Sequence, residues 1–572
     1  MMKNIQANRS ARSSAPLLLR PSAAAVLLTG LLAGCSLIPT YHRPVAPVSE
    51  QWPQESLPSA AQAPASAASA SAADADASAS DLPWQQFFTE PATPENAGLQ
   101  KIIELALANN RDLRVSIANI EQARAQYQIS RANLFPTVGL DVSQSRSAPN
   151  PYRSLGLGGN VSSNATWTVG ITAWELDLFG RIRALKDVAL AQFLATEETR
   201  KSAQMSLIAN VVDGWLQLKT DTELLALAQR TQATYEQSQK LMQLRFDNGA
   251  ASALDLREAE EMTAMARSSQ AQQRRLRAQD INLLALLAGV PAEQLPIPPV
   301  PPVTLPQAPA DDTQMADAPA STAPLPAFAD VPAGLPSDLL LRRPDIRAAE
   351  QQLIAANANI GAARAAFFPR ISLTTGFGRG SDTLGHLFGG GGSTTKAWSF
   401  TPDLSLPIFD FGSNLGNLRA AKAARDAAVA QYEKSIQTAF REVADALAGR
   451  ATYDDQLAAL QAQAKAERER YRLSDLSYRN GAASYLDLLD AQRSLFSVEQ
   501  QLAQVRMEQR SNEVALYKAL GGGWSPADEQ AAEQAAEKTS EAAAQQQAAV
   551  AVTLPASSAA SDASDAAPAA QP

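Results

Sequence analysis

The sequence contains one unit twice, and this internal repeat limits the possible folds more than any other feature. Phe135-Pro136 recurs 233 positions later as Phe368-Pro369. Asn248-Gly249 recurs 232 positions later as Asn480-Gly481. A separation that stays constant to within one position is not expected by chance, even in an alanine-rich chain. The fold is therefore expected to consist of two copies of one supersecondary unit.

Each copy carries two segments in which apolar and polar residues alternate. Val138, Leu140 and Val142 alternate with polar residues or glycine in the first copy, as Trp398 and Phe400 do in the second. A period of two is typical of a membrane-barrel strand and also of a half-buried sheet in a soluble protein. The two copies supply only four strands, whereas the smallest membrane barrels need about eight. A barrel would therefore require several chains, and either two or three would suffice.

A very long helix follows the second strand of each copy. Residues 182–245 and 415–478 contain no proline and few glycines, so each predicts a helix about 95 Å long. An Asn-Gly pair then ends each helix, and Ser252 and Ser484 are suited to start the next one as N-caps. Each copy therefore predicts a helical hairpin with Asn-Gly at its tip, belonging to an extended tube or stalk.

The N-terminus has the layout of an export signal. Basic residues precede a short apolar run at 23–32, which ends in Leu32-Ala33-Gly34-Cys35. The run is too short for a membrane-spanning helix, which needs about 20 residues, and its ending matches a bacterial lipobox. We therefore expect residues 1–34 to be removed and Cys35, the single cysteine, to be lipidated. Ser36 in place of aspartate favours the outer membrane, and this address favours the barrel interpretation of the strands.

The other predicted boundaries follow from composition. They are a lipidated N-terminal segment at 35–95 with an Ala/Ser-rich stretch, a first repeat at 96–290, a Pro/Ala-rich linker at 291–336, a second repeat at 337–524 and an Ala/Gln-rich tail at 525–572. The Ala/Ser-rich stretch and the tail have little apolar surface to bury, so both are expected to be disordered.

Charged residues share one face of the helix that follows the second tip. Asp487, Asp490 and Arg493 are spaced three residues apart. Asp487 also lies three residues after Ser484, which predicts a capping box and gives this acid a structural explanation. For Asp490, one turn further, a functional role and a solvated helix face are equally good interpretations.

Composition and motifs argue against several functional classes. A net charge of -9 disfavours a nucleic-acid partner. The two histidines, His42 and His386, are far apart in sequence, and the chain has no nucleophile elbow, phosphate-binding loop or metal-ligand spacing. We therefore expect neither an enzyme nor a bound cofactor or metal. A periplasmic adaptor or a coiled-coil scaffold lipoprotein is an alternative to a channel protein. Such a protein would share the lipobox and the long helices but would lack the paired alternating segments.

These features together resemble the outer membrane factor family, in particular its TolC- and OprM-type efflux lipoproteins. The residues that carry the resemblance are 35–44, Leu341-Arg342-Arg343-Pro344-Asp345-Ile346, Phe368-Pro369, Asp410-Phe411-Gly412, 485–493 and 516–524. The resemblance implies an α+β membrane protein. Three identical chains would form a homotrimeric, 12-stranded β-barrel, four strands from each, continued by a long α-helical periplasmic tunnel.

The resemblance also implies a gate at the closed end of the tunnel. The positions that match this periplasmic gate are Leu486, Asp487, Asp490 and Arg493. Three copies of Asp490 near one axis would repel one another unless they are screened or paired with Arg493.

The partners implied by the resemblance are those of a tripartite efflux system. The tip residues that match adaptor-docking grooves are Asn248, Gly249, Asn480 and Gly481. A periplasmic adaptor would dock there, and an inner-membrane pump, most often of the RND class, would supply the energy. The chain itself would be a passive exit duct for drugs or other small molecules, anchored in outer membrane lipid.

Overall fold

The computed structural model describes residues 36–49, 52–53, 83–89, 94–147, 162–302, 325–326, 328, 343–388 and 395–522. Cys35, the expected leader at 1–34 and the expected tail at 525–572 lie outside these ranges, as does most of the 291–336 linker.

The chain divides into two compact units. The sheet unit consists of residues 1–53, 109–203 and 336–445, and the hairpin unit consists of residues 54–108, 204–335 and 446–572. Two helices of 67 residues each, α5 (Arg181–Asp247) and α9 (Ser413–Arg479), pass from the first unit into the second. These helices were expected at 182–245 and 415–478, so the prediction of two very long helices is confirmed.

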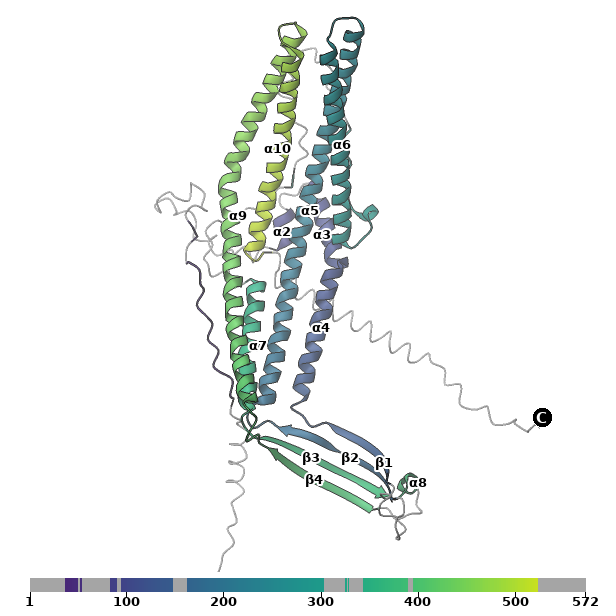
Figure 1. The fold of residues 1–572 in the computed structure, drawn as a ribbon, viewed down its shortest axis with the longest axis vertical. Coiled ribbons are helices and arrows are strands. Elements are labelled where there is room, and N and C mark those ends of the chain that lie inside the picture. The colour runs from purple at the N-terminus through teal and green to yellow at the C-terminus, as the bar shows by residue number, and fades with distance from the viewer. Residues whose placement is uncertain are drawn as a thin grey trace, which may run out of the picture. The chain divides into compact units, whose positions relative to one another are not determined.

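The long helices and the strands of the two copies follow the same order (Figure 1). The first copy contains α4 (Arg111–Ala132), β1 (Val138–Ser147), β2 (Ser162–Leu176), α5 and α6 (Ala253–Ala288). The second contains α7 (Pro344–Ala365), β3 (Arg370–Ser381), β4 (Thr395–Ser405), α9 and α10 (Tyr485–Ala519). Shorter elements are α2 (Trp84–Thr89), α3 (Pro94–Asn109), η6 (Ala292–Gln294) and α8 (Leu384–Phe388).

The four strands form one antiparallel sheet in the order β1-β2-β3-β4 (Figure 1). The pairing places the apolar alternation of all four strands on one face: Val142 lies opposite Trp167, and Phe377 lies opposite Trp398. Because side chains alternate along a strand, the intervening Thr, Ser and Gly residues lie on the other face. A bulge between Ile171 and Trp174 shifts the register of β2 against β3. The expected α+β class with four strands is confirmed.

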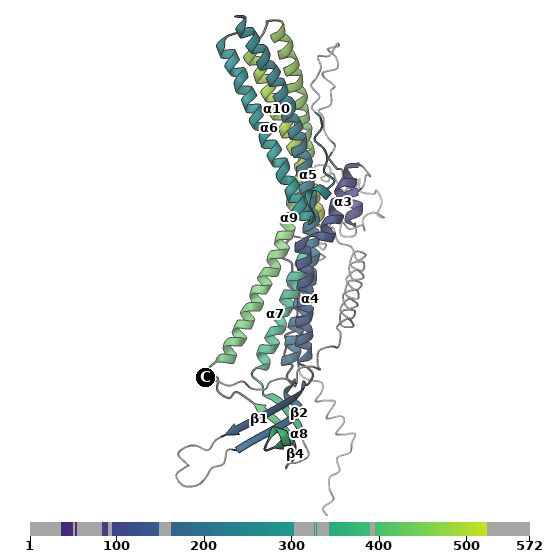
Figure 2. The ribbon, with the colours of Figure 1, turned by 90° about the vertical axis from the view of Figure 1, so that its right-hand side faces the viewer.

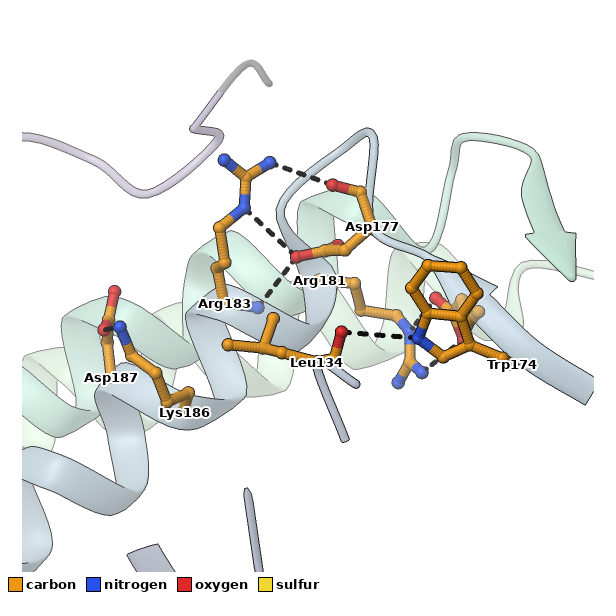
Figure 3. A network of polar contacts seen from close by, with 8 residues as sticks. Leu134, Trp174, Asp177, Arg181, Arg183, Lys186 and Asp187 are labelled. Carbon is orange, nitrogen blue, oxygen red and sulfur yellow. Dashed lines mark hydrogen bonds and ion pairs between the residues drawn. The ribbon is translucent and has the colours of Figure 1, made fainter. Parts of the chain in front are cut away.

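Both corners at which a strand passes into a long helix are held by an aspartate. Figure 3 shows the first, where Asp177 accepts the backbone N–H of Arg183 at 2.9 Å and its guanidinium at 3.2 Å. Beside it, Arg181 makes a two-point pair with Glu175 at 2.6 and 2.8 Å. The bond from the Arg183 N–H to Asp177 satisfies a backbone donor at the start of α5 that has no intrahelical partner.

The second corner is one residue shorter. Asp410 accepts the backbone N–H groups of Gly412 at 3.0 Å and Asn414 at 2.8 Å. The chain reverses through left-handed residues, with φ of 52° at Phe411 and 87° at Gly412. At this corner the separation between the copies changes from 233 to 232 positions, so the one-residue difference lies in a turn, where a change in length is tolerated.

The hairpin unit contains the two hairpins α5–α6 and α9–α10, whose turns lie at one end of the unit (Figures 1 and 2). Trp215 and Leu218 of α5 are buried in this unit, as the spacing of apolar residues predicts. Phe87 of α2 stacks on Tyr517 of α10 with ring centroids 4.0 Å apart. Across the described ranges, the helices are all too short or too polar to cross a membrane.

Candidate gate and docking tips

The two hairpin tips have the same backbone geometry. Gly249 and Gly481 take left-handed φ values of 70° and 73°. In the first tip, the N–H of Ala250 donates to Arg245 O at 2.8 Å and that of Gly249 donates to Phe246 O at 2.9 Å. This pair of bonds is the Schellman motif, which favours glycine in the left-handed position because glycine has no Cβ. The glycine positions therefore have a complete structural explanation.

The tip asparagines also bond within their own turn. Asn248 Nδ2 donates to Leu244 O at 2.6 Å, and Asn480 Nδ2 donates to Leu476 O at 2.9 Å. Both asparagines are exposed, so a binding partner could reach them.

Capping boxes begin the return helices, as the sequence predicts. Ser252 and Asp255 exchange hydrogen bonds of 3.1 Å in both directions, and Ser484 and Asp487 do so at 3.1 and 3.2 Å. The hydrogen bond from the Ser484 hydroxyl, followed by the backbone N–H of the same residue, lowers the pKa of Asp487. Asp487 thus acts first as a helix cap.

A contact between the two tips was not predicted. Arg245 Nη1 donates to the hydroxyl of Tyr478 at 2.7 Å, and the guanidinium carbon lies 5.2 Å from the centroid of the same ring. This cation–π contact joins the end of α5 to the end of α9.

An apolar cluster packs behind the tips. Its buried members include Leu256, Met262, Leu488, Leu489 and two tyrosines, Tyr235 and Tyr485. Burial raises the pKa of each of these two tyrosines to about 12. The cluster contains residues of both copies, so it fixes the two hairpins against each other.

The expected gate residues lie on the exposed side of α10. Leu486 is 57% exposed and the side chain of Asp490 is 54% exposed. The carboxylate of Asp490 is hydrogen-bonded to Arg470 of α9. Arg493 instead lies 3.7 Å from the sulfur of Met262. Within one chain, the suggested pairing of Asp490 with Arg493 is therefore replaced by pairing with Arg470.

The segment that follows the expected lipidation site lies along α7. Arg364 donates to Leu37 O at 3.1 Å and Asn357 donates to Pro39 O at 2.8 Å. Arg43 makes a two-point ion pair with Glu350 at 2.6 and 2.7 Å. Cys35 itself lies outside the described residues. In the part of the chain that is described, no three His, Cys, Asp or Glu residues are placed to hold a metal ion.

The model of the outer membrane efflux protein family matches residues 102–290 and 335–522, which include both copies of the repeat. The chain belongs to the outer membrane efflux protein family. The expected kinship with outer membrane factors is confirmed.

Curated relatives of this efflux protein have names that state their role. The probable efflux pump outer membrane protein TtgC of Pseudomonas putida is 45% identical over 504 residues, covering 88% of this chain and 95% of the relative. The outer membrane protein OprJ of Pseudomonas aeruginosa is 40% identical over 500 residues, covering 87% and 95%.

Solved structures agree with the fold. The open state of the MtrE outer membrane channel of Neisseria gonorrhoeae has a TM-score of 0.68 at 38% identity, covering 86% of this chain and 98% of that one. A Pseudomonas aeruginosa membrane protein has a TM-score of 0.71 at 39% identity, covering 86% and 98%. The predicted function and location are confirmed: this is an outer-membrane channel protein of an efflux system.

Proposed function

We propose that three copies of this chain form one passive exit duct for drugs or other small molecules. A periplasmic adaptor and an inner-membrane pump of the RND class would drive the export, and relatives named efflux pump outer membrane proteins support a pump partner. The observation that carries this proposal is the sheet. Among the described strands, β1 and β4 each have only one neighbour, so both edges of the sheet are open.

A single soluble chain would be unstable with two open sheet edges and an exposed apolar face. Leu140 on β1 is 67% exposed, and Trp398 and Phe400 on β4 are 78% and 60% exposed. Pairing β1 of one copy with β4 of the next would close the edges and turn the apolar face to lipid. Three copies would then supply a closed wall of twelve strands, with the Thr, Ser and Gly face turned to the duct.

Pairs of exposed leucines support a docking role for the tips. Leu241 and Leu244 on α5 are 47% and 60% exposed, and Leu473 and Leu476 on α9 are 48% and 43% exposed. The two pairs occupy the same positions in the two copies, 232 residues apart. Exposed apolar pairs beside Asn248-Gly249 and Asn480-Gly481 suit the binding of a partner protein. The adaptor would therefore meet two equivalent surfaces on each chain.

A charge-neutral change at these surfaces tests the docking proposal. We expect L244S/L476S to weaken adaptor binding in a pull-down with the purified adaptor while trimer formation stays normal. The matched control is L286S on α6, which is also exposed but lies at the other end of that helix. Unchanged adaptor binding by L244S/L476S would remove these leucines from the docking surface.

The gate proposal places Leu486, Asp487, Asp490 and Arg493 at the closed end of the duct. Truncating Asp490 and Arg493 to alanine shortens side chains that narrow the axis, so D490A/R493A should raise single-channel conductance in planar bilayers. Equal conductance in wild type and variant would exclude both residues from the gate. C35S tests the lipid anchor at Cys35 separately. This variant should no longer incorporate a labelled fatty acid, whereas the wild-type protein should.

The expected chain organisation is part of the proposal. It consists of a removed leader (1–34), a lipidated segment (35–95), two repeats (96–290 and 337–524) joined by a linker (291–336), and a tail (525–572). Mass spectrometry of the mature protein tests the first boundary, because cleavage should leave Cys35 at the N-terminus.

A further inference from the structure

The charged group that accompanies the gate carboxylate comes from the facing helix of the same hairpin. Arg470 on α9 binds Asp490 on α10, and its second amine lies 3.3 Å from Glu467 and 3.4 Å from the hydroxyl of Ser494. The same guanidinium also lowers the pKa of Asp487 through its charge, after the hydrogen bonds from Ser484. One cation therefore serves both acids of the proposed gate.

The two partners of this ion pair are not equivalent. In the described residues, Arg470 is the single ion-pair partner of Asp490, whereas Arg470 has both Asp490 and Glu467. Without Asp490, Arg470 would still have the carboxylate of Glu467 as a partner. Without Arg470, Asp490 would have no cationic partner among the described residues.

The first hairpin has no such ion pair. The positions equivalent to Arg470 and Asp490, 232 residues earlier, are Ser238 and Glu258. The contact is therefore not a general requirement of the hairpin fold, because α5 and α6 pair without it. Its occurrence in the copy that carries the proposed gate calls for another explanation.

We propose that Arg470 is the positioning residue that keeps the gate closed, by neutralising Asp490 so that three copies of this carboxylate can approach one axis. The proposal rests on the proposed gate function. Without the guanidinium, the three carboxylates repel one another and the ring widens, because like charges in a confined site cannot all stay ionised and close together. Arg493, which contacts Met262 in the neighbouring hairpin, is not the partner that holds the charge.

The test uses the full-length trimeric channel in planar bilayers. R470Q should raise the open-to-closed ratio by about fivefold, which is the lower end of the range typical of allosteric coupling between two sites. D490N should have a smaller effect, because Asn keeps the side-chain volume and Arg470 keeps Glu467. R470K should behave as wild type, because the lysine retains the charge.

The decisive variant is R470Q/D490N, which removes both charges. It should return the channel towards the closed state of the wild type, a rescue that a merely structural role of Arg470 would not produce. The matched control is R472Q, two residues away on α9, which removes the same charge but pairs with Glu469 at 2.8 Å and not with Asp490. R472Q should leave gating unchanged.

Two results would overturn the inference. In the first, R470Q gates like wild type while R493Q opens the channel, which would make Arg493 the partner. In the second, R470Q/D490N leaks as much as R470Q, which would mean that Arg470 does not act through Asp490. If the wild-type protein forms no channel at all, the proposed function is wrong. If the wild-type protein conducts and R470Q gates like it, only the proposed role of Arg470 is wrong.

Discussion

The two hairpins of the chain have the same backbone but carry different chemistry. Their long helices have equal length, their tips share the left-handed glycine and their return helices share the capping box. Behind this common frame, the first hairpin holds a pair of acids, Asp221 and Asp280, and the second holds Tyr453 and Asn512 at the equivalent positions. The same backbone rules therefore hold in both copies, whereas the charged side chains at equivalent positions differ.

The largest expected difference between the hairpins concerns burial at one position. Leu489 is 1% exposed in the apolar cluster, whereas its counterpart Arg257 has a side chain that is 73% exposed. L489A should cost about 2–5 kcal/mol because it leaves a cavity, and R257A should cost less than about 0.5 kcal/mol. The thermal unfolding midpoint of the purified channel, followed by circular dichroism at the helix band, checks both. Equal shifts would mean that the cluster does not stabilise the second hairpin.

The acid pair predicts a pH dependence of stability that arises in the first hairpin. Asp221 is almost fully buried and shares a hydrogen bond with Asp280, so burial, followed by the hydrogen bond and charge of Asp221, raises the pKa of Asp280 to about 7. Since this folded-state pKa lies above the ordinary value of 3.8, the folded chain binds the proton more tightly than the unfolded chain. The stability from this proton is full below about pH 4 and is lost as the pH rises to about 7.

The D280N variant isolates this effect, because asparagine is the residue that the second hairpin has at the same place. We expect wild type to lose thermal stability between pH 4 and 7 and D280N to lose less over the same range. Gln217, which donates to Asp221 at 3.2 Å, stays in place in this variant. Identical pH profiles would show that Asp221 and Asp280 do not share a proton.

The capping boxes should contribute equally in the two copies. S252A and S484A each remove one side-chain acceptor from the first turn of a return helix, at a cost of about 1 kcal/mol. Hydrogen exchange at the backbone N–H groups of Asp255 and Asp487 reports the loss directly. A large effect at one tip and none at the other would contradict the equivalence of the two turns.

The smallest expected effect comes from an ion pair in which the acidic and basic residues exchange helices between the copies. Arg267 on α6 binds Glu236 on α5 at 2.9 Å, and at the same level Glu499 on α10 binds Arg468 on α9 at 3.0 Å. The second pair is the less exposed of the two, so R468Q should destabilise slightly more than R267Q, both within about 1 kcal/mol. Thermal midpoints at low and high salt check this, because the difference should shrink as salt screens the charges.

The sequence was sufficient for features that depend on local rules. Proline-free length predicted α5 and α9, Asn-Gly predicted the left-handed tips, and Ser484 with Asp487 predicted a capping box. Each of these features depends on residues within one or two helical turns of each other. Because the sequence contains the unit twice, each prediction could be checked against its counterpart in the other copy.

Contacts between helices could not be predicted in the same way. Asp490 and Arg493 share one helix face, which suggested that they pair, but the partner of Asp490 is Arg470, 20 residues earlier on the facing helix. The contact of Arg245 with Tyr478 joins residues 233 positions apart. Such pairs depend on how each helix is rotated and packed, and spacing along one helix carries no information on that.

The number of chains in the channel decides whether the chains share one barrel wall, since four strands with two open edges need further copies to close it. Native mass spectrometry of the detergent-extracted protein measures it. We expect a species of three chains that dissociates only on strong heating. A stable species of one chain would contradict it, because the edges of β1 and β4 would then have no partner.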